Sequence, residues 1–377
     1  MICFAWAGFP QYAARCIRKV VQGSKEEVVV IAAKPKVPVL GMDELVGCKV
    51  IWISYFEQRS LKELLGGEVP RFLFVSGWHN RVFRRFGKEA HAFGGKVVAM
   101  VDNNWMLSGK NFTSLVWWKL AIFEFIKAIR FRICYRFNYD GFIVPGKSGE
   151  RLLQFYGVPK RKITQGLYSA DSELFSSGGE ISKRSKIIIY VGQYIERKNV
   201  RRMLIAFAEA ACYLRCAWKL VMYGSGELRT ELDSLAKKYN QQLSEFGAKI
   251  EVNNFLQPEE LAPLYREACF FCLPSTEEHW GLVVHEAALS GCLLMLSKYI
   301  GAADDLFIRD ENGTNGIIFD PYNKVEMKNA FISSMGMDLQ LANKMQSKSV
   351  EKAKKISTSR FATAVFSLLA KLRSSVL

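Results

Sequence analysis

Residues 274–291 read PSTEEHWGLVVHEAALSG, and this stretch decides the fold. The apolar run at 268–273 before it is short enough to form a buried strand. Residues 282–289 after it favour a helix, and Gly291 supplies a stop signal. The loop between them therefore ends a strand and opens a helix. In an open parallel α/β sheet, that is where ligands bind.

The same loop combines a helix start with two carboxylates. A helix start offers unpaired N–H groups and a partial positive charge to a phosphate. Gly281 has no Cβ, so a phosphate can approach the backbone closely. Glu278 lies just before the helix and Glu286 about one turn into it. One carboxylate can bind a ribose and the other a second polyol, with a diphosphate between them, which suits a nucleotide sugar.

Glu278 and Glu286 stand eight residues apart, and the stretch between them resembles the Glu-x7-Glu motif of family-4 retaining glycosyltransferases. Three more segments resemble motifs of that family in the same order: YVGQYIERKN at 190–199 (its phosphate loop), MYGSGELR at 222–229 (its second glycine turn) and NGTNGIIFDP at 312–321. The resemblance covers roughly residues 187–325 well and the N-terminal half weakly. It implies the GT-B architecture, two Rossmann-like α/β domains facing each other across a cleft.

The strand and helix patterns divide the chain of 377 residues in the same way. Short apolar runs alternate with helical segments in both halves, which predicts two parallel sheets. We expect an acceptor-binding domain at 1–168, a linker at 169–186 and a nucleotide-sugar domain at 187–355. By the resemblance, a last helix at 356–377 packs back towards the first domain.

Positive charge is concentrated in the N-terminal half. The net charge is +16, and residues 1–180 carry 26 Lys and Arg against 15 Asp and Glu, a net of +11. Such an excess suits nucleic acid, anionic lipid or a diphosphate-bearing acceptor. The sequence contains no recognisable nucleic-acid module, so we expect no nucleic-acid partner.

The cysteine pattern and the N-terminus indicate a cytoplasmic protein. The nine cysteines form no disulfide framework, which favours buried thiols in a reducing compartment. Residues 1–11 lack the basic start and apolar core of a signal peptide. No apolar stretch reaches the length of a membrane span. Without a better acidic cluster, we expect no metal and no cofactor beyond the sugar donor.

The resemblance assigns the donor site residue by residue. Lys198 matches the phosphate lysine, Glu286 the ribose glutamate and Glu278 the glutamate near the transferred sugar. The family usually has arginine where this chain has Gln193, so Arg197 is the candidate for the missing charge. The other expected donor contacts are Gly192, Gly224, Gly226, Trp280, Gly281 and Leu282.

Each of these residues also has an ordinary structural interpretation. Lys198 can be a solvated cation, Glu286 a partner in a helix-face salt bridge and Glu278 a loop charge. Gly224 and Gly226 can form a plain helix-entry turn. Trp280 can stack on the donor or wedge its loop in place.

Two residues in the N-terminal half are candidates for the acceptor. Asp102 follows the strand predicted at 96–101, where it can orient or deprotonate an acceptor hydroxyl. It can equally cap a turn. Gly8 lies in the first strand-to-helix turn and is a candidate acceptor or phosphate contact. A retaining enzyme of this type needs no dedicated base if the departing phosphate takes the proton.

Residues 105–137 read WMLSGKNFTSLVWWKLAIFEFIKAIRFRICYRF, a basic, aromatic and amphipathic segment. Its charges argue against a membrane span, but such a helix can lie in the interface of an anionic membrane. The alternative is that its aromatic residues pack onto the sheet and its lysines face water. The candidate lipid contacts are Arg84, Arg85, Trp117, Trp118, Lys119, Lys127 and Arg130.

The sequence thus predicts a retaining glycosyltransferase that moves a sugar from a nucleotide-diphosphate donor to an acceptor hydroxyl. By analogy we expect a lipid-diphosphate-linked glycan as acceptor, at the inner face of the cell membrane, as in O-antigen, capsule or exopolysaccharide synthesis. A nucleotide-sugar epimerase or phosphorylase of the same fold is the alternative enzyme. A basic nucleic-acid-binding protein is the alternative from another class. Because Gln193 weakens the phosphate loop, a non-catalytic membrane scaffold is a further alternative.

Overall fold

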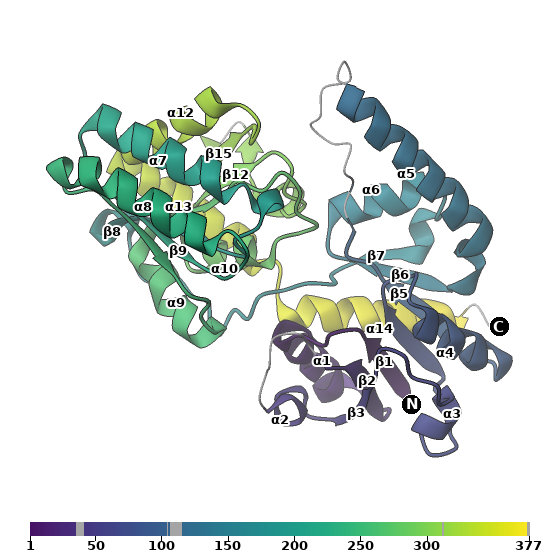
Figure 1. Cartoon of the computed structure of the whole chain (residues 1–377). Helices are drawn as coiled ribbons and strands as arrows, with labels where there is room; N and C mark the ends of the chain where they lie inside the picture. The colour runs from purple at the N-terminus through teal and green to yellow at the C-terminus, as the bar shows by residue number, and fades with distance from the viewer. Residues whose placement is uncertain (35–40, 104, 106–114, 311–312, 375–377) are drawn as a thin grey trace. The chain divides into compact units, whose positions relative to one another are not determined.

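The computed structural model describes residues 1–34, 41–103, 105, 115–310 and 313–374. The chain forms two compact units (Figure 1). Unit 1 comprises Met1–Ser169 together with Ile356–Leu377, and unit 2 comprises Ala170–Lys355. The last stretch of the chain therefore belongs to the same unit as the first.

Unit 1 is built on a seven-stranded parallel sheet with the strand order β3-β2-β1-β4-β5-β6-β7. The strands are β1 (Ile2–Trp6), β2 (Val28–Ala33), β3 (Lys49–Ile53), β4 (Phe72–Ser76), β5 (Lys96–Met100), β6 (Gly141–Val144) and β7 (Ile163–Gln165). The helices are α1 (Gln11–Gly23), α2 (Met42–Val46), α3 (Leu61–Leu64), α4 (Arg81–Ala92), α5 (Leu115–Cys134), α6 (Lys147–Phe155) and α14 (Thr358–Ser374).

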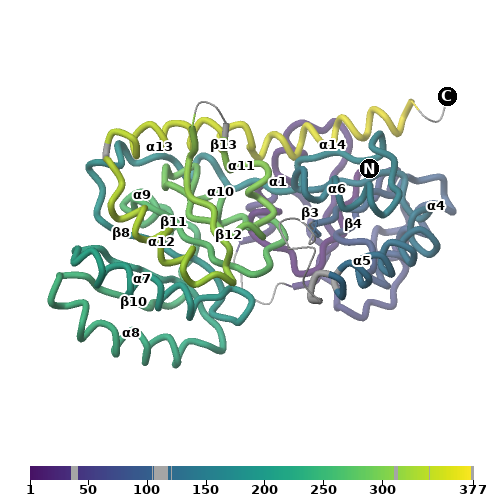
Figure 2. The backbone as a smooth tube through the Cα atoms, turned by 90° about the horizontal axis from the view of Figure 1, so that it is seen from above, coloured from purple at the N-terminus to yellow at the C-terminus, as the bar shows by residue number. Residues whose placement is uncertain are grey.

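The central strands are apolar at every position except Ser76 at the end of β4, which is typical of a sheet buried on both faces. On one face, α14 lies along α1 (Figure 2). There Phe361 packs 6.1 Å from Phe4, whose ring stacks on Phe74 at 4.9 Å between centroids. The other face is covered around Phe86 and Phe131. The order reverses between β1 and β4, so the switch point of unit 1 lies beyond the carboxyl ends of these two strands.

Unit 2 is built on a six-stranded parallel sheet with the order β10-β9-β8-β11-β12-β15. The strands are β8 (Ser185–Val191), β9 (Lys219–Tyr223), β10 (Lys249–Asn253), β11 (Ala268–Leu273), β12 (Leu293–Ser297) and β15 (Gly316–Phe319), with a small β13–β14 hairpin (Arg309–Asp310 and Gly313–Thr314). The helices are α7 (Val200–Leu214), α8 (Arg229–Leu243), α9 (Pro258–Glu267), α10 (Leu282–Leu289), α11 (Ala303–Leu306), α12 (Lys324–Met335) and α13 (Leu339–Lys354).

The stretch before β8 is tied into unit 2 at several points. The Ala170 N–H donates to His285 Nδ1 at 2.9 Å, and His285 Nε2 lies 3.0 Å from the Ala353 carbonyl. Arg184 donates to the carbonyls of Ala268 and Ser290 at 3.0 and 2.9 Å. His285 thus links Ala170, the first residue of the unit, to Ala353 near its end through one buried side chain.

The predicted class, two parallel α/β sheets, is confirmed. The helix expected at 282–289 has those bounds, and the strands expected at 268–273 and 96–101 agree within one residue. Several elements were not predicted individually, among them α6, β7 and α13. The α13 sequence, LQLANKMQSKSVEKAK, is polar over most of its length, and its buried positions are small or unbranched residues such as Ala342 and Met345.

Candidate active site

Lys198 and Glu278 meet at the carboxyl edge of the unit 2 sheet. Lys198 ends the 3-10 turn Glu196–Lys198 after β8, and Glu278 lies in the loop after β11. The Lys198 ammonium donates to Glu278 Oε2, with 9% and 12% of the two side chains exposed. Lys198 is the one lysine that is buried in the part of the chain the structure describes. A buried cation needs a partner, so the solvated-cation interpretation of Lys198 does not hold.

The two loops that carry this pair are tied together by hydrogen bonds. The Thr276 N–H donates to the Arg197 carbonyl at 2.8 Å, and Arg197 Nη1 donates to the Glu277 carbonyl at 3.1 Å. Asn199, in the left-handed region at φ 57°, donates from Nδ2 to the carbonyls of Pro274 and Pro321 at 3.3 and 2.9 Å. These bonds fix the backbone on either side of Lys198 and Glu278.

The two glycine turns of unit 2 pack directly against each other. The Tyr194 N–H donates to the Ser225 carbonyl at 2.8 Å, and the Leu228 N–H donates to the Tyr194 carbonyl at 3.0 Å. A Cβ at Gly224 would lie 1.9 Å from the Gly192 carbonyl oxygen, and one at Gly226 would lie 2.5 Å from that of Tyr194. Close backbone packing is therefore sufficient to require glycine at both positions.

Gln193 and Arg197 lie on the exposed side of this loop. The Gln193 carbonyl accepts a hydrogen bond from the Tyr190 phenol at 2.8 Å, which fixes the backbone while the amide side chain faces solvent. The Arg197 guanidinium is held near the second loop by its bond to Glu277. Arg197 is thus close to the Lys198–Glu278 pair. A residue that replaces the charge of the family arginine would have to lie there.

Helix α10 begins at Gly281 and carries Glu286 on its buried face. Gly281 has φ 91°, a conformation that side-chain-bearing residues rarely adopt. The first N–H groups of a helix have no partner four residues before them within it. Here the Val284 N–H donates to the Gly281 carbonyl at 2.9 Å, so the N–H groups of Leu282 and Val283 are the ones considered for a phosphate. Glu286 is buried, and its Oε2 accepts a hydrogen bond from the Tyr265 phenol at 3.3 Å. Burial raises the pKa of Glu286 to about 7, although the bond from Tyr265 opposes this shift.

Trp280 is buried, with its ring edge-on to His285 at 5.9 Å between centroids. Its carbonyl accepts a hydrogen bond from the Ala302 N–H at 2.8 Å, and the Glu278 carbonyl accepts one from Gly301 at 3.1 Å. These contacts join the loop after β11 to the loop after β12. They favour the wedge interpretation of Trp280 over stacking on a donor.

In unit 1, Gly8 and Asp102 follow the carboxyl ends of β1 and β5. The Asp102 carboxylate accepts a hydrogen bond from the Tyr168 phenol, which also bonds to Tyr12. Burial is the main cause that raises the pKa of Tyr168 far above its ordinary value, so this phenol stays a neutral donor. Gly8 has φ 65°, and a Cβ there would meet only the Tyr55 hydroxyl, at 3.5 Å. The edge of unit 1 thus offers one tethered carboxylate.

As far as its side chains are described, helix α5 packs onto the rest of unit 1 along one narrow seam. Glu124, Ala128, Phe131 and Tyr135 are buried, and the Tyr156 phenol donates to Glu124 at 2.8 Å. Other large apolar side chains of the helix are exposed: Trp118, Ile122, Phe123, Phe125, Ile126, Ile129 and Ile133. The alternative in which aromatic residues of this segment pack onto the sheet therefore applies to the buried Phe131 and Tyr135 and not to the exposed side chains.

The basic candidates around α5 differ in their surroundings. Lys119 is exposed, Lys127 donates to Glu124 at 2.7 Å, and Arg130 donates to the Tyr135 phenol at 3.3 Å. Arg84 lies over the Tyr135 ring at 5.3 Å. Arg85 instead donates to the carbonyls of Glu57 and Arg59 at 2.7 and 2.8 Å, which ties α4 to the neighbouring loop. Trp117 lies in α5, but its side chain is outside the described residues.

Among the described residues, no group of three or more His, Cys, Asp or Glu side chains is arranged to hold a metal ion. None of the helices that the structure describes combines the length and the apolar character that crossing a membrane requires.

Sequence reasoning missed two residues that shape the site, Tyr265 and Asn199. Tyr265 lies in α9, fully buried between Phe175 and Phe271, and no local pattern points from α9 to Glu286. Asn199 had a detectable signal, because asparagine is enriched in the left-handed region and is favoured at helix starts.

Comparison with known proteins gives one family and a consistent fold. Residues 171–355 match the family described as "Glycosyl transferases group 1". The chain is 24% identical over 196 residues to a GalNAc-α-(1→4)-GalNAc-α-(1→3)-diNAcBac-PP-undecaprenol α-1,4-N-acetyl-D-galactosaminyltransferase of Campylobacter jejuni, covering 52% of this chain and 50% of that protein. It is 28% identical over 220 residues to a D-inositol 3-phosphate glycosyltransferase of Corynebacterium kroppenstedtii, covering 52% and 46%. The matched region is thus about half the length of these curated relatives, or less.

The solved structures that resemble this chain do so over nearly its full length. Anabaena HepE in complex with UDP superimposes with a TM-score of 0.68 at 14% identity, covering 98% of this chain and 100% of that one. The α,α-trehalose 6-phosphate synthase of Burkholderia multivorans gives 0.70 at 12% identity, covering 100% and 99%. At these identities the likeness shows the fold alone, which is GT-B.

Proposed function

Since the chain belongs to the glycosyl transferase group 1 family and has the GT-B fold, we propose that it is a retaining glycosyltransferase. In this proposal unit 2 binds a nucleotide-diphosphate sugar at the carboxyl edge of its sheet. The observation that carries the proposal is the buried Lys198–Glu278 pair beside the start of α10. A cation, a carboxylate and a helix start there match the diphosphate, the sugar and the phosphate-binding backbone of such a donor.

The chemistry follows from the charges of these groups. The bond between the sugar C1 and the diphosphate oxygen breaks, and negative charge develops on the departing diphosphate. The Lys198 ammonium and the N–H groups at the start of α10 stabilise that charge. The Glu278 carboxylate stabilises the positive charge that develops on the sugar ring. The acceptor oxygen attacks from the side that the phosphate leaves, and the phosphate takes its proton.

Glu286 serves the nucleotide part of the donor. It lies about one turn into α10, and the Tyr265 phenol donates a hydrogen bond to one carboxylate oxygen. The remaining lone pairs can accept hydrogen bonds from two ribose hydroxyls. Structures of the same fold in complex with UDP make uridine diphosphate the first nucleotide to test, with guanosine and adenosine diphosphates beside it.

The first test is a thermal-shift screen of the purified protein against these three diphosphates and their sugars, without added metal. A ligand that binds the folded state raises the melting temperature. We expect one nucleotide to give a clear shift that Glu286→Ala abolishes. Transfer assays then use that nucleotide's sugar. Donor turnover without an acceptor would favour an epimerase or phosphorylase, and unchanged binding and transfer in both Glu286→Ala and Lys198→Ala would remove the proposed site.

For the acceptor we propose a lipid-linked glycan at an anionic membrane surface. The support comes from α5, where Trp118, Ile122, Phe125, Ile129 and Ile133 are spaced to form one outward stripe. Lys119 and Arg130 lie next to each other along one side of this stripe on the wheel, and basic residues beside an apolar face are typical of interfacial helices. The Campylobacter relative is named for an undecaprenol-diphosphate-linked glycan, which agrees with this proposal. The proposal includes surface-polysaccharide synthesis, at the inner face of the membrane, as the process that this transfer serves.

Vesicle flotation tests this membrane proposal. Phe125→Glu, at the centre of the stripe, should abolish binding to vesicles that contain anionic lipid. Val325→Glu is the matched control, because Val325 is a similarly exposed apolar residue on α12 of unit 2. Equal flotation of both variants and the parent protein would remove α5 as the membrane surface. Soluble-donor binding serves as the folding control, because neither substitution lies at the donor site.

A further inference from the structure

Two arginines from different helices of unit 1 approach one tyrosine ring. The guanidinium of Arg84, in α4, lies over the Tyr135 ring at 5.3 Å from its centroid. The guanidinium of Arg130, in α5, lies 5.9 Å from the same centroid, and its Nη2 donates to the Tyr135 hydroxyl at 3.3 Å. Because the face of an aromatic ring attracts cations, Tyr135 holds the two positive charges near each other.

The ring beneath these arginines belongs to the core of unit 1. Tyr135 is buried, and the Trp78 ring lies edge-on to it at 4.9 Å between centroids. Trp78 is also edge-on to Phe131 at 4.9 Å, and its carbonyl accepts a hydrogen bond from the Tyr139 phenol at 2.8 Å. The two guanidinium groups thus rest on a packed base. Side chains that are ordered beforehand lose less entropy when they bind a ligand.

The charge of this arginine pair is not balanced by a carboxylate. Neither guanidinium contacts an Asp or Glu side chain in the described part of unit 1. The carboxylates on and beside the two helices bind other groups: Glu89 the Leu61 N–H, Glu124 the Lys127 ammonium, and Asp140 the His91 ring. The stretches of unit 1 outside the described residues, 35–40, 104, 106–114 and 375–377, contain no Asp or Glu in their sequence. Their side chains therefore add no negative charge.

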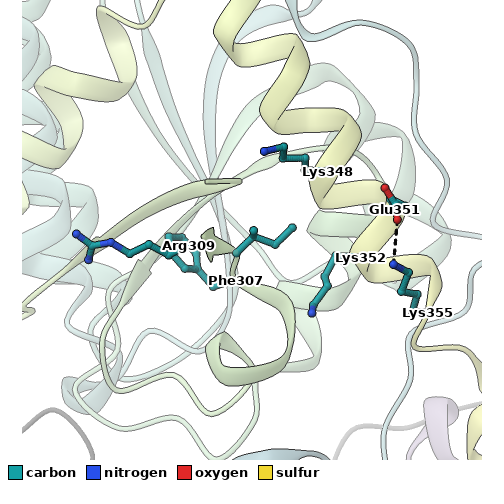
Figure 3. Close-up of a pocket in the computed structure, with 7 residues that line it drawn as sticks. Phe307, Arg309, Lys348, Glu351, Lys352 and Lys355 are labelled. Atoms are coloured by element: carbon teal, nitrogen blue, oxygen red, sulfur yellow. Dashed lines mark hydrogen bonds and ion pairs between the residues drawn. The ribbon is translucent and has the colours of Figure 1, made fainter. Parts of the chain in front are cut away.

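A basic hollow in unit 2 shows the contrast (Figure 3). This hollow of about 440 Å³ has a lining in which four cations surround one carboxylate, namely Arg309, Lys348, Lys352, Lys355 and Glu351. Glu351 accepts a hydrogen bond from Lys355 Nζ at 2.9 Å. The positive charge around the hollow is thus partly balanced from within, whereas the pair over Tyr135 has no such partner among its contacts in the described residues.

Exposed apolar side chains adjoin the arginine pair. Ile126 lies four residues before Arg130 and Ile133 three residues after it, so both are its neighbours on the surface of α5. Their side chains are 57% and 73% exposed, and Phe137, shortly after Tyr135, is 81% exposed. A ligand that fits both parts of this surface carries a negative group beside an apolar group. Anionic lipids have this chemistry.

We propose that Arg84 and Arg130 together bind the terminal phosphate of an anionic lipid, while the exposed isoleucines of α5 contact its acyl chains. Each guanidinium presents a planar fork of donors that matches the oxygens of a phosphate, and two forks can bind different oxygens of one group. A phosphate that is esterified on both sides offers fewer charged oxygens to the pair. This inference rests on the proposed membrane surface of α5 and adds the headgroup that this surface selects.

The test is flotation with two kinds of phosphatidylcholine vesicle, one containing phosphatidic acid and the other phosphatidylglycerol, matched in zeta potential. We expect the parent protein to bind the phosphatidic acid vesicles about fivefold more tightly, because only they present a terminal phosphate. Arg84→Gln and Arg130→Gln should each remove most of this preference. Arg71→Gln is the matched control. Arg71 is exposed and lies over the Phe72 ring at 5.5 Å, outside α4 and α5, and its loss changes the net charge equally.

Phe125→Glu separates this inference from the membrane proposal. If Phe125→Glu abolishes flotation but the parent protein shows no preference for phosphatidic acid, the membrane surface stands and the arginine pair is not a phosphate site. A preference that persists in both arginine variants, or that Arg71→Gln removes equally, would also overturn the inference, since general charge then suffices. If the parent protein binds neither vesicle, the membrane surface and the phosphate site fall together. Melting temperatures equal to that of the parent protein show that the variants are folded.

Discussion

The carboxyl edges of the two sheets differ in how tightly they are built. In unit 2, Lys198, Glu278 and Asn199 are held by bonds that join the loops after β8, β11 and β15. In unit 1, Asp102 is tethered through Tyr168, and a Cβ at Gly8 would meet the Tyr55 hydroxyl at 3.5 Å. Within the described residues, which leave out 35–40 after β2 and 104 and 106–114 after β5, the edge of unit 1 is thus less cross-linked between loops than that of unit 2. The difference suits a common donor at the edge of unit 2 and an acceptor particular to this protein at the edge of unit 1.

The ion pair of unit 2 gives the largest expected effect. Lys198→Ala removes the cation proposed to stabilise the leaving diphosphate and leaves Glu278 without it. Loss of one charge-stabilising group typically costs roughly 10²–10³ in turnover, and we expect a decrease of that order in the transfer rate. Steady-state transfer assays measure it. Arg202→Ala, an exposed cation on the following helix turn, is the control that should stay within about twofold.

If Lys198→Ala left kcat and KM unchanged, the Lys198–Glu278 pair would contribute to the structure and not to catalysis. The stability of the variant must be measured beside its activity, because breaking a buried pair costs about 3–5 kcal/mol. Lys198→Arg separates the two effects. It keeps the charge and alters the geometry, so it should recover stability before it recovers turnover.

The glycines test the same contrast at the level of packing. An alanine Cβ at Gly224 would lie 1.9 Å from the Gly192 carbonyl oxygen, whereas one at Gly8 would meet only a hydroxyl at 3.5 Å. We expect Gly224→Ala to destabilise unit 2 by about 3 kcal/mol through overpacking. Gly8→Ala should cost about 1 kcal/mol, from its positive φ alone. Urea denaturation of both variants measures this, and equal losses would contradict the contrast.

Glu286 makes the stability of unit 2 depend on pH. Burial raises its pKa from 4.5 to about 7, so between these values the folded chain holds a proton that the unfolded chain has released. Stability from this group is therefore full below pH 4.5 and falls as the pH rises to 7. A shift of this size corresponds to about 3 kcal/mol. Above pH 7, the buried and charged Glu286 carboxylate therefore lowers the stability of unit 2.

Glu286→Gln cannot ionise and should lack this dependence. Urea denaturation of the parent protein and the variant at pH 4.5, 6 and 8 gives the measurement. The variant's free energy of unfolding relative to the parent should rise by about 3 kcal/mol over that range. Other titrating groups are common to both proteins and cancel in the difference. A constant difference across the range would mean that Glu286 is not protonated in the folded chain.

The same contrast explains how much the sequence predicted. Motifs around Lys198 and Glu278 were readable because each is local, with a strand, a glycine turn and a helix start in succession. The pairing of Glu286 with Tyr265 was not readable, since it joins α9 to α10 through a phenol that looks like any core aromatic. The tether from Tyr168 to Asp102 spans more than sixty residues. The outward stripe of α5 could be identified only from the structure, which shows that Glu124, Ala128, Phe131 and Tyr135 are buried. Periodicity alone did not tell which side of the helix packs onto the rest of unit 1.

Asp102 gives the smallest effect and examines the open edge of unit 1. If its carboxylate orients an acceptor hydroxyl, Asp102→Asn should reduce transfer about tenfold, the low end for a lost acid–base or orienting group. Nucleotide binding to unit 2 should not change, and this serves as the internal control. Tyr168→Phe removes the donor that tethers Asp102 and should reduce transfer by a smaller factor. If Asp102→Asn and Tyr168→Phe instead lower the melting temperature equally and spare transfer, Asp102 is a structural cap. The acceptor must then be held by groups beyond those at the edge of β5.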